Sequence, residues 1–80
     1  AMPTLLVHVM NDDPLMGEVD NLPNPTDQFL ILKNPRRKDG KDLAFIEANV
    51  TTLIWPFLRI TFIEVMPTGE EEEIITFVRE

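Results

Sequence analysis

The chain has 80 residues, of which 44% are hydrophobic and 26% are charged, a composition typical of one small globular domain. Its 14 acidic and seven basic residues give a net charge of −7, which argues against a general nucleic-acid binder. Cysteine is absent and histidine occurs once, so disulfides, thiolate metal sites and a cysteine nucleophile are excluded.

Apolar residues alternate with a period of two over residues 4–10, which predicts a strand rather than a helix. Leu5, Val7 and Val9 share one face of this strand, and we expect that face to be buried. The Asn-Asp-Asp-Pro sequence of residues 11–14 predicts a turn after it.

A second strand is predicted over residues 15–22, with Leu15, Gly17 and Val19 directed inward. Glycine weakens a strand because it has no side chain to pack, so its presence there indicates a bend or a closely approaching backbone. We therefore expect one of these two features at Gly17.

The middle of the chain contains a run that is apolar on both faces, Phe29-Leu30-Ile31-Leu32, as a central strand would be. We expect Asn34-Pro35 to end this strand and Asp39-Gly40 to form the tip of a hairpin. Residues 43–55 are rich in β-branched and aromatic residues and predict a further, bent strand.

The last part of the chain begins at a corner. Pro56 cannot donate to a strand ladder, so Trp55-Pro56-Phe57 predicts a tight change of direction. Residues 59–66 alternate most regularly, and we expect Ile60 and Phe62 to point inward. A final strand is predicted over residues 74–78.

Together these segments make about six short strands separated by turns, without an amphipathic helix of useful length. The sequence predicts an all-β fold, a small and strongly bent five- or six-stranded barrel, forming a single domain over residues 1–80. Residues 67–80 would add a C-terminal hairpin strand. Ala1 before Met2 indicates a residue left from cloning.

Two stretches match a known pattern. The opening strand and turn lead into Leu15-x-Gly17-x-Val19, and residues 53–65 run Leu-Ile-x-Pro-x-x-Arg-Ile-x-Phe-Ile-Glu-Val. They resemble the bent second strand and the last two strands of Sm/LSm-like domains, which are SH3-like β-barrels. The resemblance covers most of residues 4–66. It implies a five-stranded barrel, often assembled in rings through edge pairing of the last two strands.

The residues with which Sm proteins bind RNA are not repeated here. That family carries Asp-x-apolar-Asn near its second and third strands and Arg-Gly before the fifth. This chain has Asp27-Gln28-Phe29-Leu30 and Trp55-Pro56-Phe57 at those places. The usual uridine pocket is therefore not expected.

The sequence does not support a catalytic function. His8 lies on a largely apolar strand face, which favours a structural or interface histidine. Asp12 and Asp13 adjoin Pro14 and are interpreted as turn formers rather than as paired carboxylates. Since no nucleophile or base with a partner can be recognised, we expect no enzyme activity, no metal and no cofactor.

A basic stretch, residues 33–41, carries five bases and one acid. Two of the bases are arginines, whose forked donors suit phosphate, but no aromatic is interleaved to stack nucleic-acid bases. The favoured interpretation is a solubilising hairpin tip or ion pairs to acidic neighbours. The candidate anion or nucleic-acid contacts are Lys33, Arg36, Arg37, Lys38 and Lys41.

The chain has more apolar surface than one small barrel can cover. Phe29–Leu32, Leu53–Trp55 and Ile60–Val65 have apolar residues on both faces, and residues 59–65 contain no Pro or Lys to protect an open edge. We therefore expect a homo-oligomer, such as a ring. Core packing alone would also explain the two aromatic residues among the candidates. The candidate subunit contacts are Trp55, Phe57, Arg59, Ile63 and Val65.

The sequence thus favours a non-catalytic Sm-like subunit that self-assembles and acts as a scaffold or interaction module. The alternative is a single-stranded nucleic-acid binder that uses residues 33–41, with RNA as the partner. No apolar run is long enough to span a membrane and no signal peptide opens the chain, so we expect a cytoplasmic protein without a membrane partner.

Overall fold

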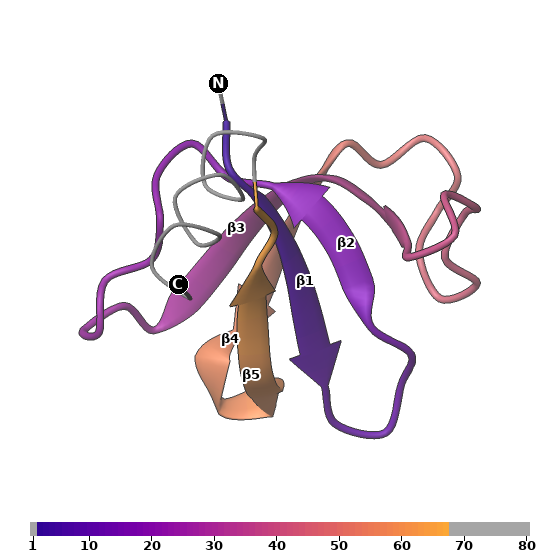
Figure 1. The fold of residues 1–80 in the computed structure, drawn as a ribbon. Helices are drawn as coiled ribbons and strands as arrows, with labels where there is room; N and C mark the ends of the chain where they lie inside the picture. Colours follow the sequence, from indigo (N-terminus) through magenta and orange to yellow (C-terminus); the bar gives the residue numbers. More distant parts are fainter. Residues whose placement is uncertain (1, 68–80) are drawn as a thin grey trace, which may run out of the picture.

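The computed structural model describes residues 2–67 and shows one bent antiparallel sheet of five strands in the order β4-β3-β2-β1-β5 (Figure 1). This confirms the predicted small all-β fold. The predicted strand over residues 74–78 and the residue assigned to cloning, Ala1, lie outside the described residues. The elements are β1 (Thr4–Val9), β2 (Leu15–Glu18), β3 (Phe29–Arg37), β4 (Thr52–Pro56), a 3₁₀ turn η1 (Phe57–Arg59) and β5 (Ile60–Val65).

The core lies on the inner face of the sheet and includes the alternating residues of 4–10 and 15–22 that the sequence predicted to be inward. The predicted turn between β1 and β2 is present, and Asn11 there has a φ of 67°, a left-handed conformation that asparagine tolerates. Burying a Leu or Val side chain fully stabilises a fold by about 1.5–3 kcal/mol, so these residues hold the strands together. The buried core consists of Leu5, Val7, Val9, Leu15, Val19, Leu30, Leu32 and Leu43.

Gly17 lies where β2 and β3 approach each other most closely. A Cβ at this position would lie 2.6 Å from Leu32 Cγ and 2.7 Å from the carbonyl oxygen of Lys33, so β3 would have to move to admit one. The register between the two strands also shifts here, between Met16 and Glu18. The predicted close approach at Gly17 is therefore confirmed.

Asn34-Pro35 bends β3 but does not end it, so the predicted end of this strand was wrong: β3 continues to Arg37. Lys33 and Arg36 are three positions apart, whereas their partners on β2 are two positions apart, which places a bulge between them. Asn34 there has a positive φ of 54°, and a proline without an N–H is tolerated at such a bulge.

The chain turns at Asp39-Gly40 as predicted, with Gly40 at a φ of 90°, but the expected hairpin arm does not follow. Of the strand predicted over residues 43–55, only Thr52–Pro56 is a strand, and residues 41–51 form a loop. Leu43 in this loop is buried in the core, so the apolar content that predicted a strand serves to cover the core instead. In Figure 1 this loop and the β2–β3 connection project from opposite sides of the sheet.

The corner predicted around Pro56 is confirmed, because η1 follows it directly and leads into β5. The prediction that Phe62 of β5 points inward was wrong, because Phe62 is 52% exposed. Ile60 and Ile63 both pack against the core instead. The register between β1 and β5 shifts next to Val9, the partner of Ile60. This bulge allows two residues three positions apart to share the inner face.

Candidate interaction surfaces

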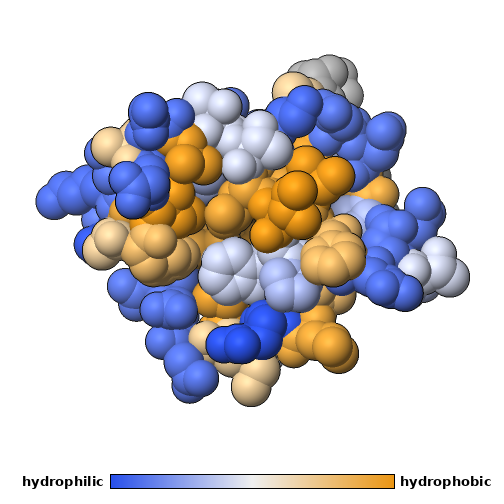
Figure 2. All heavy atoms as spheres, turned by 180° about the vertical axis from the view of Figure 1, so that it is seen from behind, coloured by the Kyte–Doolittle hydropathy of each residue, from blue (hydrophilic) through white to orange (hydrophobic). Residues whose placement is uncertain are grey.

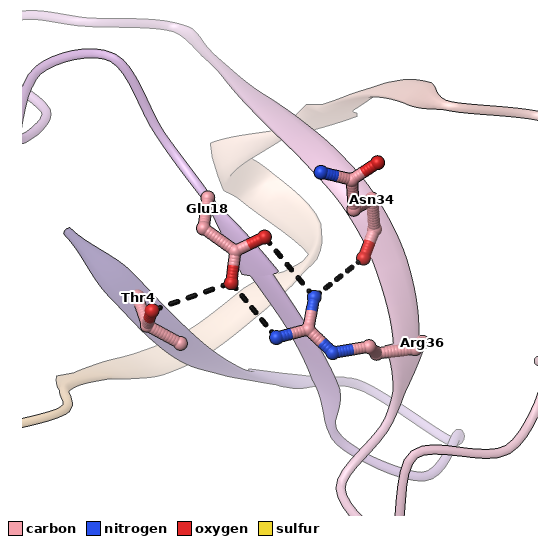
Figure 3. Close-up of polar contacts among 4 residues, drawn as sticks. All are labelled: Thr4, Glu18, Asn34 and Arg36. Carbon is pink, nitrogen blue, oxygen red and sulfur yellow. Dashed lines mark hydrogen bonds and ion pairs between the residues drawn. The ribbon is translucent and has the colours of Figure 1, made fainter. Parts of the chain in front are cut away.

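Arg36, a candidate anion contact, is held by Glu18 on the neighbouring strand (Figure 3). Its two terminal nitrogens donate to both carboxylate oxygens of Glu18, at 2.8 and 3.1 Å, and one also donates to the carbonyl oxygen of Asn34 at 2.8 Å. The Thr4 hydroxyl donates to the same carboxylate at 3.3 Å. The hydrogen bonds between the two side chains lower the pKa of Glu18 and raise the pKa of Arg36. Arg36 thus helps to tie β1, β2 and β3 together.

Two other cations of the basic stretch also have carboxylate partners. Among the described residues, Lys38 and Lys41 make no ion pair. The stretch therefore has ion pairs to acidic neighbours, as its composition favoured, rather than a row of unpaired cations. The two pairs are Lys33 with Asp20 at 3.1 Å and Arg37 with Asp39 at 3.2 Å.

The candidate subunit contacts fall into two groups. Trp55, Phe57 and Ile63 are partly buried and pack against the core, which matches the core interpretation of the two aromatic residues. Arg59 and Val65 are exposed, the latter by 49%. A contact made through β5 would therefore use its backbone edge and its exposed side chains rather than Ile63.

Three exposed apolar residues lie together on the outer face of β3 and β4. Phe29 and Ile31 are 55% and 53% exposed, and Ile54, directly opposite Ile31, is 62% exposed. We call Phe29, Ile31 and Ile54 the open apolar face. Figure 2 shows apolar surface gathered across the middle of the molecule as seen from behind. The sequence indicated this surface, because Phe29–Leu32 is apolar on both faces, but it did not single out these residues as a site.

β4 forms one end of the sheet, so its second edge is unpaired within the described residues. The N–H of Phe57 donates to the carbonyl oxygen of Gln28 at 2.9 Å. Because N–H groups alternate in direction along a strand, every second residue of β4, counted back from Phe57, directs its N–H toward β3. The N–H groups of Thr52 and Ile54 therefore face away from β3. Pro56 lies at a position where an N–H would also face away from β3, so its lack of an N–H removes no hydrogen bond between β3 and β4.

β5 forms the other end of the sheet and also has an unpaired edge within residues 2–67. The N–H of Met66 donates to the carbonyl oxygen of Thr4 at 2.8 Å. Because N–H groups alternate in direction along a strand, every second residue of β5, counted back from Met66, directs its N–H toward β1. The N–H groups of Ile63 and Val65 consequently face away from β1. The part of the chain that the structure describes thus offers two open edges in each copy.

His8, on the outer face of β1, contacts two residues of β5. Its Nε2 lies 2.8 Å from a carboxylate oxygen of Glu64, and its ring stacks on Phe62 with ring centroids 4.0 Å apart. Cross-strand pairs of this kind stabilise a sheet, in line with a structural role for the histidine.

Comparison with protein-family models, with curated proteins and with solved structures finds no match to this chain. Within the described part of the chain, no three Asp, Glu or His side chains gather in a way that could hold a metal ion. No helix among the described residues is long and apolar enough to cross a membrane. Function is therefore inferred from the open edges, the open apolar face and the pairing of the cations.

Proposed function

We propose that the protein is a non-catalytic, Sm-like subunit that self-assembles and acts as a scaffold or interaction module. The observation that carries this proposal is that β4 and β5, at the two ends of one sheet, both have an edge left open by residues 2–67. An open edge is a template for pairing with another chain. Pairing of β4 in one protomer with β5 in the next uses both edges of every copy when the repeat closes into a ring.

The residues of the two edge strands support this proposal. Soluble monomers protect open edges with lysine or with a proline inside the strand. β4 and β5 contain no lysine, and Pro56 stands at the last position of β4. The exposed Ile54 and Val65 add apolar surface beside the edges, which favours a protein contact over free solvent.

The nucleic-acid alternative has less support. Lys33, Arg36 and Arg37 each have a carboxylate partner. A phosphate would have to displace Glu18 from Arg36, where a forked, charge-assisted pair is already formed.

Light scattering coupled to size exclusion tests self-assembly on the full chain. We expect the wild type to have a mass that is a multiple of the 9.2 kDa subunit. Ile54→Pro removes an N–H that faces away from β3, so it should keep the fold but reduce the mass. Ile54→Thr keeps that N–H and serves as the matched control. A wild type that runs as a monomer would contradict self-assembly.

A further inference from the structure

Two adjoining hollows lie beside the open apolar face. The first, of about 250 Å³, lies between residues 19–27 of the β2–β3 connection and residues 29–31 of β3. The second, of about 380 Å³, lies between residues 27–29 and residues 56–58 at the β4–β5 corner. Asp27 and Phe29 line both hollows, so the two form one continuous surface.

The wall of the second hollow is largely apolar, whereas that of the first is about equally polar and apolar. Phe29 is shared by both, and Pro56 and Leu58 line the second. Leu58 is 92% exposed, and Phe29 is more than half exposed, so the described part of the chain leaves this surface uncovered. Exposed aromatic and aliphatic side chains next to a hollow are typical anchors for a protein contact.

Among the described residues, the ionisable groups that line the hollows are all acidic. They are Asp20 and Asp27, and no lysine or arginine of residues 2–67 lines either hollow. Asp27 accepts a hydrogen bond from the N–H of Asn24 at 2.9 Å through Oδ2, and its Oδ1 has no hydrogen bond within the described residues. Asp20 is 62% exposed beside Lys33. A carboxylate thus stands at the junction of the two hollows.

We infer that this surface binds an extended segment of another protein that carries Lys or Arg next to an aliphatic or aromatic residue. The apolar side chain would fill a hollow against Phe29, and the cation would lie against Asp27. The net charge of −7 attracts such a segment and repels an acidic one. A second copy of the chain fits less well, because most cations of residues 33–41 are already paired.

The inference names a partner for the proposed interaction module and rests on that role. It does not rest on self-assembly, which would use the strand edges. The two can therefore fail separately. A ring that binds no basic peptide would contradict this inference alone, and a monomer that binds such a peptide would contradict self-assembly alone.

Titration of the full-length, isotope-labelled protein by nuclear magnetic resonance tests the inference with three synthetic peptides. One consists of Lys-Leu-Arg-Phe repeats, one of Glu-Leu-Asp-Phe repeats and one of Lys-Ser-Arg-Asn repeats. We expect the first peptide to shift the amide signals of residues 19–31 and 56–58 and to bind about tenfold more tightly than the others, a difference of about 1.4 kcal/mol. Equal binding of all three, or shifts confined to other residues, would overturn the inference.

Two double variants with the same change in net charge separate a local site from general attraction. Asp20→Asn with Asp27→Asn keeps the hydrogen-bond acceptors at the hollows but removes their charge. Asp12→Asn with Asp13→Asn makes the same change in the β1–β2 turn. We expect the first variant to bind the Lys-Leu-Arg-Phe peptide several-fold more weakly and with less dependence on salt, and the second to change affinity by less than about twofold. Equal losses in the two variants would contradict a site at the hollows.

Discussion

The two halves of the sheet differ in the side chains on their outer surface and in the partners that these side chains have within the chain. Over β1, β2 and β5, polar side chains find partners within the chain. Glu18 holds Arg36 through two hydrogen bonds, and His8 contacts Glu64 and stacks on Phe62. These contacts satisfy the side chains of Glu18, Arg36 and His8 without a second molecule, and what this half leaves open within residues 2–67 is the backbone edge of β5.

Over β3 and β4 the outward side chains are Phe29, Ile31 and Ile54, each more than half exposed. Here the described residues provide two adjoining hollows and an open edge, and those of them that line the hollows include acidic residues but no basic ones. Exposed apolar residues also lie on β5, at Phe62 and Val65, and Phe62 there stacks on His8. The exposed apolar residues of β3 differ in that they adjoin two hollows, where an interaction with another chain can use them.

The largest expected effect is on the free energy of unfolding, and it distinguishes two neighbouring residues that lie on opposite faces of β3. Leu30→Ala removes a buried side chain and should lower the free energy of unfolding by about 3 kcal/mol. Ile31→Ala removes a half-exposed one and should cost less than about 1 kcal/mol in a monomeric state. Urea unfolding followed by Trp55 fluorescence measures both. Equal losses would mean that the open apolar face is covered within the chain.

A smaller effect is expected where β2 and β3 meet. Gly17→Ala should lower the free energy of unfolding by about 2 kcal/mol, because its Cβ would overlap Leu32 and the Lys33 carbonyl. Gly40→Ala is the matched control, since its Cβ would meet no atom within 4 Å and only the positive φ opposes it, at about 1 kcal/mol. The same denaturation curves compare the two. A neutral Gly17→Ala would contradict the close approach.

The smallest of the three effects concerns the polar half. Arg36 holds the pKa of Glu18 below its ordinary value of 4.5, so this pair stabilises the fold above that pH. The contribution should be lost as the pH falls through the lowered pKa of the folded state. Glu18→Gln should therefore cost about 1 kcal/mol at neutral pH, and the difference from wild type should shrink in acid.

Asp20→Asn is the control for this pH dependence. Its partner Lys33 and its own carboxylate are both well exposed, so the change should stay under about 0.5 kcal/mol. Urea unfolding over a series of pH values gives both variants. A difference between wild type and Glu18→Gln that is independent of pH would contradict the stabilising pair.

Local patterns in the sequence were sufficient to predict much of the fold. Period-two alternation predicted the inward faces of β1 and β2, and Gly17 predicted the close approach of β3. The bulge at Asn34-Pro35 and the bulge beside Ile60 were missed, because alternation assumes a ladder without extra residues. For this reason Phe62 and Ile63 exchanged their expected faces.

The candidate surfaces were predicted less completely. The composition of residues 33–41 showed that cations gather there, but the partner of Arg36 lies on a different strand, and no local signal connects the two. The excess of apolar residues predicted that some stay exposed. Only the pairing of β3 with β4 shows that Ile31 and Ile54 lie opposite each other.

Backbone amide exchange at Ile54 and Ile63 in the full chain tests most directly whether β4 and β5 meet in an assembly. Both N–H groups face away from their own sheet, so they exchange freely in a monomer and slowly when paired with a second copy. Ring assembly predicts protection of both amides that increases with protein concentration, while Leu53, which faces β3, stays protected throughout. Fast exchange of Ile54 and Ile63 at every concentration would contradict assembly through these edges.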